Sequence, residues 1–162
     1  MKTKIFSSLL SFVALGVLWC CSVLSASAQV QVDHYYIISN VSNGKVLSTG
    51  GKDAKDAPLV GETLQKNSPN QLWQLKKSEP DAVALYNPFA ELAVDLAIKS
   101  NKGPLLWSLD VTNPNQQLIL EPEGNNFRLR AASYQHEELY LAVTSGGRVM
   151  LEFEKTKNSL FK

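Results

Sequence analysis

The stretch Ser68-Pro69-Asn70-Gln71-Leu72-Trp73 decides the fold of this chain, because two weaker copies of it follow at nearly constant spacing. The second copy is Asn113-Pro114-Asn115-Gln116-Gln117-Leu118, and the third is Lys157-Asn158-Ser159-Leu160-Phe161. Their asparagines, Asn70, Asn115 and Asn158, lie 45 and then 43 residues apart. Self-similarity at a fixed period is the sequence signature of repeated structural units. The chain therefore contains one unit three times.

Apolar runs separated by turn-forming residues surround each copy. They cover residues 36–40 and 57–61, then 83–87 and 103–107, then 127–131 and 147–151. The alternation in Phe127-Arg128-Leu129-Arg130 is typical of a strand with one solvated face. Between the runs lie glycine- and asparagine-rich turns such as Ser42-Asn43-Gly44. Each repeat is predicted to form about four short strands, over residues of about 34–78, 81–121 and 126–162.

A unit of this size cannot bury its own apolar face, so three units must close around a shared axis. Closure also protects the exposed edges of the strands. We therefore predict one all-β domain, a β-trefoil.

The segment from Asn87 to Lys99 admits a second interpretation. Asn87 followed by Pro88, with apolar residues at helical spacing, favours a helix. The repeat instead aligns residues 92–94 with 45–47 and 140–142, which have the pattern of strands. We expect a strand here, with a helix as the alternative.

The first 28 residues have the pattern of a secretory signal. Lys2 and Lys4 precede an apolar run, and the segment ends in Ala26-Ser27-Ala28. The run is shorter than the roughly 20 residues that span a bilayer, so no stable membrane insertion is expected. We predict a mature domain of residues 29–162 that is secreted, either extracellular or periplasmic if the source is a Gram-negative bacterium. Both cysteines lie in the predicted signal, so this domain relies on its core without a disulfide.

Charge and residue types argue against several function classes. Without Lys2 and Lys4 the 16 basic residues fall to 14, against 15 acidic residues, a net charge near −1. This balance does not favour a nucleic-acid partner, which requires a basic surface. No pattern of metal-ligating or paired catalytic residues is apparent. We expect a protein that is not an enzyme and that uses no cofactor and no metal.

The repeated motif resembles that of the ricin-type (ricin B-like) β-trefoil lectins, whose repeat carries Gln-x-Trp preceded by Asn. The resemblance extends from about Tyr35 to Phe161 and is complete in the first repeat. It implies architectural roles for Gln71 and Trp73 and for their weaker counterparts Leu118 and Phe161. Whether the last repeat closes fully, one residue before the end of the chain, is left open.

The resemblance also implies a sugar site within one repeat, made of an Asp, an aromatic residue about a dozen positions later, and the motif Asn. Only the second repeat offers all three, as Asp95, Trp107 and Asn115, with Gln116 in support. The matching positions are occupied by Ser48, Gly61 and Asn70 in the first repeat and by Val143, Leu151 and Asn158 in the third. One galactose-type site is therefore expected.

Other interpretations of these residues stay open at this point. Asp95 is alternatively a solvated carboxylate beside Lys99, and Trp107 a packing residue under a loop. The leading hypothesis is a secreted, lectin-like protein whose partner is a glycan or glycoprotein. The rival is a trefoil without sugar binding that acts on a protein through its loops, as a protease inhibitor or adhesion factor does. The sequence does not indicate the oligomeric state.

Overall fold

Short strands and single helical turns follow one another in the same order three times along the chain. The computed structural model describes residues 31–162 except 80, 101 and 134–137, so the predicted signal peptide lies outside the described residues. The first repeat contains β1 (Tyr35–Tyr36), β2 (Val46–Ser48), β3 (Val60–Glu62), η1 (Pro69–Gln71) and β4 (Trp73–Lys77). The second contains β5 (Val83–Asn87), β6 (Leu92–Asp95), β7 (Leu105–Trp107), η2 (Pro114–Gln116) and β8 (Leu118–Glu123). The third contains β9 (Asn126–Ala131), β10 (Tyr140–Val143), β11 (Val149–Glu152) and η3 (Lys157–Ser159), where η marks a 3-10 turn.

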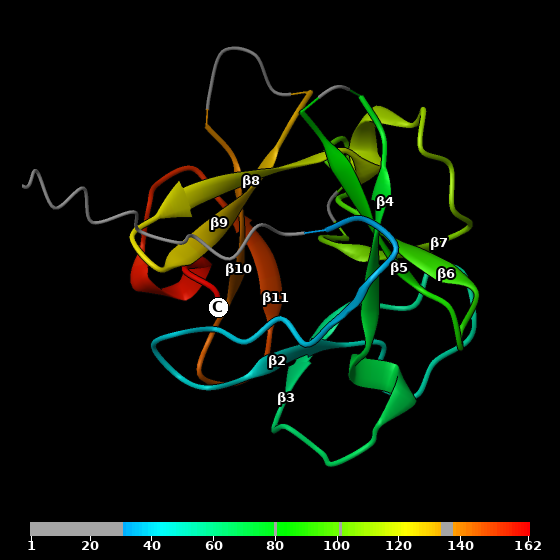
Figure 1. The fold of residues 1–162 in the computed structure, drawn as a ribbon, viewed down its shortest axis with the longest axis horizontal. Coiled ribbons are helices and arrows are strands. Elements are labelled where there is room, and N and C mark those ends of the chain that lie inside the picture. The colour runs from blue at the N-terminus through cyan, green and yellow to red at the C-terminus, as the bar shows by residue number, and fades with distance from the viewer. Residues whose placement is uncertain (1–30, 80, 101, 134–137) are drawn as a thin grey trace, which may run out of the picture.

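Strand pairing arranges the three repeats as a β-trefoil, which confirms the predicted fold class. Strands β1, β4, β5, β8 and β9 pair in that order, and every pair is antiparallel. The hairpins β2–β3, β6–β7 and β10–β11 hold the remaining strands, one hairpin to each repeat (Figure 1). Among the described residues no α-helix occurs, and no helix is long and apolar enough to cross a membrane.

The end of the third repeat closes the ring of strands with very few residues. Phe161 forms isolated bridges to both Asn40 and Phe127, so it lies between the first repeat and β9. Ser39 and Lys162 exchange two backbone hydrogen bonds, of 3.0 and 2.9 Å. The fourth strand of this repeat is thus reduced to a bridge, but it still joins the two ends of the fold.

The segment that also had a helical pattern forms the strand β6. The Asn87 side chain accepts hydrogen bonds from the backbone amides of Phe89 and Ala90, at 3.0 and 2.8 Å, and so closes a tight turn instead of starting a helix. Its amide group donates to the carbonyls of Pro69 and Leu72 at either end of η1. Pairing of β6 with both β5 and β7 buries Leu92 and Val94 in the core. These long-range contacts outweigh the local helical pattern.

The three motif positions meet in one hydrophobic core. Trp73, Leu118 and Phe161 are all fully buried, and the Trp73 indole donates to the carbonyl of Leu47 at 2.9 Å. Leucines of every repeat pack with them, among them Leu47, Leu85, Leu106, Leu129 and Leu141. An apolar side chain at the same buried place in each repeat supplies the shared core that a single repeat lacks.

Two glycines allow the hairpins of the first and third repeats to touch. A Cβ atom on Gly61 would lie 2.3 Å from a Val143 methyl group, and one on Gly147 would lie 2.3 Å from the Gly61 carbonyl oxygen. Gly147 also has a φ of +84°, which other residues rarely adopt. The hairpins therefore approach backbone to backbone at this point.

Candidate functional site

Asp95 and Trp107 lie on the same outward face of the β6–β7 hairpin. Asp95 pairs with Leu105, and Trp107 pairs with Ala93. Val94 and Leu106, the pair between them, point into the hydrophobic core. Because alternate residues of a strand face opposite sides, both Asp95 and Trp107 face outward. As diagonal neighbours across two strands, their Cα atoms are about 7 Å apart.

The Asp95 carboxylate is held in a fixed orientation. One oxygen accepts a 2.8 Å hydrogen bond from the backbone amide of Ala97, and the other accepts a 3.2 Å bond from the side-chain amide of Asn113. Asp95 is only 7 % exposed, which does not match a freely solvated carboxylate. An ionised carboxylate has about four acceptor positions, so about two are left for another donor.

The η2 turn brings its asparagines to the chain beside Asp95. The Asn113 side chain caps this turn by accepting from the Asn115 amide at 3.0 Å. The Asn115 carbonyl in turn accepts a 2.8 Å bond from the amide of Leu96. The half-buried Asn115 side chain lines a cavity together with Ile98, Lys99, Pro114 and Ser133.

Asn113 is therefore the amide that contacts Asp95, and the sequence prediction did not include it. An Asn directly before a Pro that opens a helical turn is a capping signal, and this signal could have drawn attention to Asn113.

Gln116 is fully buried and binds only the backbone around it. Its amide nitrogen donates to the Ser108 carbonyl, and its oxygen accepts from the Asp110 amide, both at 2.9 Å. Gln71 makes the same two bonds in the first repeat, to Thr63 at 3.0 Å and from Gln65 at 2.8 Å. Gln116 can thus support a site only by holding the loop between β7 and η2.

The Trp107 ring is open to solvent on the surface of the second repeat. It is 42 % exposed, which does not match a residue packed beneath a loop. The ammonium group of Lys55 lies 5.6 Å from the ring centroid, a cation–π distance. Lys55 belongs to the first repeat, so only the tertiary structure reveals this contact.

The strand register corrects part of the comparison between repeats. The strands before each hairpin pair Ser39 with Val46, Tyr86 with Ala93 and Arg130 with Tyr140, so the inward pairs Leu47–Gly61, Val94–Leu106 and Leu141–Leu151 are equivalent. The counterparts of Trp107 are therefore Glu62 and Glu152, rather than Gly61 and Leu151. The counterparts of Asp95 are Ser48 and Ala142, rather than Ser48 and Val143. Only the second repeat still combines a carboxylate at one position with an aromatic ring at the other.

A second polar cluster joins β8, β10 and the loop before η3. Burial, with a hydrogen bond to Glu138, raises the pKa of Tyr140 to about 12. The hydrogen bond from Lys155 lowers the pKa of Glu121, which also lies 3.4 Å from Arg130. This cluster consists of paired charges, and the described residues contain no group of three or more His, Cys, Asp or Glu that could hold a metal ion.

Comparison with known proteins identifies both a family and a fold. Residues 26–106 match the model of the family described as ricin-type beta-trefoil lectin domain-like. No curated protein matches the sequence.

Solved structures with this fold include a designed protein, a lectin and an enzyme. The designed three-fold symmetric protein ThreeFoil superimposes with a TM-score of 0.69 at 20 % identity, over 79 % of this chain and 96 % of that one. A Polyporus squamosus lectin, bound to a human-type influenza-binding epitope, gives 0.63 at 16 % identity, over 82 % of this chain. An exo-β-1,3-galactanase from Clostridium thermocellum gives 0.68 at 20 % identity, also over 82 %. The present chain covers 49 % of that lectin and 30 % of that enzyme, so the similarity is one of fold.

Proposed function

Because this chain belongs to the ricin-type β-trefoil lectin domain-like family, we propose that it binds a galactose-type sugar at one site on its second repeat. Membership of the family implies carbohydrate binding, and the residues of the site are our proposal. We further propose that the protein acts after export, once residues 1–28 have been removed.

One observation supports this site most strongly: Asp95 and Trp107 face outward together, and only in the second repeat. The free acceptor positions of Asp95 suit two neighbouring sugar hydroxyl groups, and the Asn115 amide, which lines the cavity with Ile98 and Lys99, offers a further donor and acceptor. The exposed face of Trp107 suits the apolar face of a pyranose ring. Asn113 and Gln116 hold these groups in place through the contacts described above.

The expected affinity is low. A hydrogen bond to a charged group contributes about 1.5 to 3 kcal/mol, and an aromatic contact about 0.5 to 1.5 kcal/mol. Their sum is close to the binding free energy of a millimolar complex, about −4 kcal/mol. Useful binding therefore requires several copies of the domain or a multivalent glycan.

We propose binding without catalysis. The C. thermocellum galactanase shows that this fold also occurs within an enzyme. Hydrolysis of a glycosidic bond generally requires two carboxyl groups, and the proposed site contains one, Asp95.

A glycan array tests the proposal directly. The mature chain, multimerised on a carrier, is expected to bind galactose-terminated glycans, and Trp107→Ala and Asp95→Asn are expected to lose at least tenfold of that binding. Leu64→Ala is the matched control, since Leu64 is an apolar residue of the first repeat that is 54 % exposed. Thermal melts of all variants separate loss of the site from loss of the fold.

Equal binding by the wild type and both site variants would show that the sugar binds elsewhere. Absence of any glycan binding by the multimerised protein would favour the rival function, contact with a protein through the loops.

A further inference from the structure

A row of outward-facing residues crosses the sheet and ends at Trp107. The strand register connects one residue from each of five neighbouring strands: Tyr35 with Gln74, Gln74 with Tyr86, Tyr86 with Ala93, and Ala93 with Trp107. Directly paired residues of antiparallel strands point to the same side of the sheet. Three aromatic rings therefore share one face, separated by one glutamine and one alanine.

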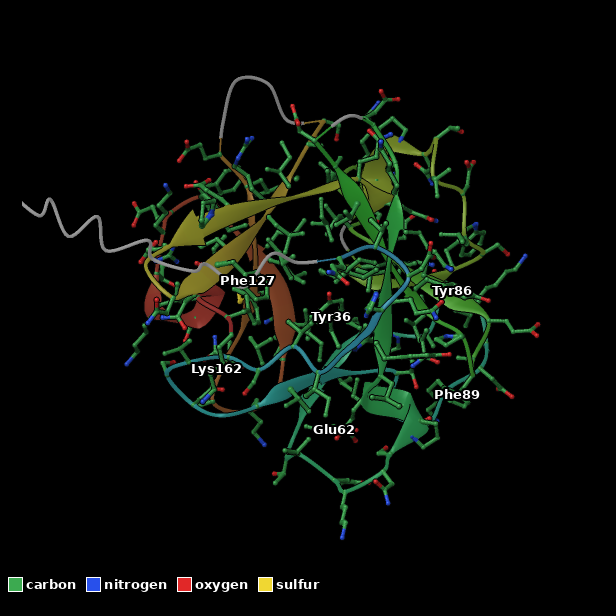
Figure 2. All side chains as sticks on the ribbon, viewed as in Figure 1. Tyr36, Glu62, Tyr86, Phe89, Phe127 and Lys162 are labelled. Atoms are coloured by element: carbon green, nitrogen blue, oxygen red, sulfur yellow. The ribbon has the colours of Figure 1, made fainter. Side chains whose placement is uncertain are left out.

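Two of these rings flank one small residue. Ala93 lies directly opposite both Tyr86 and Trp107 and is fully buried, as expected for a small side chain between two larger ones on the same face. The rings remain accessible, since Trp107 is 42 % exposed, Tyr35 is 55 % exposed and Tyr86 is half-buried. Figure 2 shows Tyr86 near the edge of the molecule, far from Phe127.

The spacing of the rings suits an extended ligand. Neighbouring strands lie about 4.8 Å apart, so Tyr86 is about 10 Å from Trp107 and Tyr35 is about 20 Å from it along the sheet. A step of two strands is about the length of a disaccharide. A compact ligand would contact one ring, whereas a linear chain of sugars would contact all three.

Hydrogen-bonding groups lie along the same row. The Lys76 ammonium group lies 5.7 Å from the Tyr86 ring centroid and forms a 2.6 Å ion pair with Asp33. Gln74 lies directly between Tyr35 and Tyr86, with its side chain half-buried. Lys55 occupies the corresponding place beside Trp107. Donors for sugar hydroxyl groups thus accompany each aromatic contact along Tyr86 and Trp107.

We propose that this face binds a linear oligosaccharide of about four sugar residues, whose terminal galactose-type residue occupies the Trp107 site and whose chain runs over Tyr86 toward Tyr35. The inference rests on the proposed function, because it extends that site. It assigns the ligand class as an extended glycan chain, where the site alone would require only a single sugar.

The test compares ligand length in solution. Linear galacto-oligosaccharides of one, two, four and six residues are titrated into the mature protein by NMR. Affinity is expected to rise about three- to tenfold for each added ring contact and to level off near four residues. The Tyr86→Ala variant should bind galactose as the wild type does but lose the increase in affinity with oligosaccharide length. The Tyr86→Phe variant should keep that increase.

Two controls isolate the row. Tyr35→Ala is expected to remove only the last step of the gain. Phe153→Ala, which removes a 61 % exposed aromatic residue from the third repeat, is expected to leave the whole length series unchanged.

The outcomes separate the two proposals. If galactose binds through Asp95 and Trp107 but affinity does not rise with length, the extended surface is wrong and the proposed function stands. If long chains bind through Tyr86 while Asp95→Asn has no effect, the row is correct and the galactose-type site is wrong. If Tyr86→Ala weakens galactose and the tetrasaccharide by the same factor, Tyr86 only supports Trp107 and the inference fails.

Discussion

The first and second repeats are nearly identical inside and different outside. Gln71 and Gln116 make the same two backbone hydrogen bonds and hold equivalent loops. Ser48 and Asp95 also make the same local bond, since each accepts from the backbone amide two residues later, at 3.0 and 2.8 Å. The two repeats therefore share one backbone geometry.

The outward side chains separate a proposed site from a surface without one. Where the second repeat has Asp95, Trp107 and Asn113, the first has Ser48, Glu62 and Ser68. The Ser68 side chain makes no capping hydrogen bond, whereas Asn113 contacts both its own turn and Asp95. The motif that identifies the fold therefore acts inside the molecule, whereas the proposed function depends on outward side chains that leave the fold unchanged.

The largest expected contrast is between the two tryptophans. Trp73→Ala removes a fully buried ring and its bond to Leu47, and should lower the free energy of unfolding by about 3 to 5 kcal/mol. Trp107→Ala removes a ring that is 42 % exposed and lies outside the core, and it should lower the free energy of unfolding by less than about 1 kcal/mol while abolishing the proposed sugar binding. Urea denaturation of both variants checks the difference, and equal losses would contradict the division between inside and outside.

The equivalence of the two glutamines is tested by deleting each in turn. Gln71→Ala and Gln116→Ala each remove a buried side chain and the two hydrogen bonds by which it holds a surface loop, at a cost of about 1 to 3 kcal/mol. The two losses should agree within about 1 kcal/mol, because their contacts are the same. A much larger loss of sugar binding than of stability in Gln116→Ala, at a temperature where the variant is folded, would instead point to direct contact with the ligand.

The outward-facing residues of the second repeat can be introduced into the first repeat by substitution. The triple variant Ser48→Asp, Glu62→Trp and Ser68→Asn places the residues of the proposed site on an equivalent backbone. When this variant is titrated to saturation with galactose and followed by NMR, it should show two binding sites for each chain in place of one. The variant carrying Gly61→Trp instead of Glu62→Trp is the control, and it should fail to add a site, because Gly61 faces the core against Val143.

The smallest expected effect is one on the pH dependence of stability, at the position three residues after Trp73 in the first repeat and after Leu118 in the second. The first repeat has Lys76 here, and the second has Glu121, whose pKa is lowered mainly by the hydrogen bond from Lys155. Because the pKa of Glu121 is lower in the folded protein than its ordinary value of 4.5, the ionised carboxylate stabilises the fold at any pH above 4.5. This stabilisation is lost as the pH falls through the pKa of Glu121 in the folded protein.

Urea midpoints at pH 7 and pH 3 should therefore differ less in Glu121→Gln than in the wild type. Lys155→Met should reduce the difference in the same direction, because it removes the partner that lowers the pKa. A pH dependence identical in all three proteins would exclude this pair as a source of acid sensitivity.

Several features of the fold and site were predictable from local sequence. The copies of the Asn70–Trp73 motif predicted three repeats and a trefoil, and alignment of the repeats predicted a strand over residues 92–94 against the local helical pattern. The coincidence of Asp95 with Trp107 followed from residue type and spacing. The bond from Asn113, the lysines beside Tyr86 and Trp107, and the true counterparts of Trp107 did not follow, because each depends on register or on another repeat.

The sequence by itself determined the architecture, since a core requires only apolar side chains at a regular period, and that period is visible in one dimension. Only the tertiary structure decided which residues face outward together. A shift of one position along a strand moves a side chain from the core to the surface, as it does between Gly61 and Glu62, and the row from Tyr35 to Trp107 joins strands of two repeats. Strand register therefore decides which surface is available to a ligand.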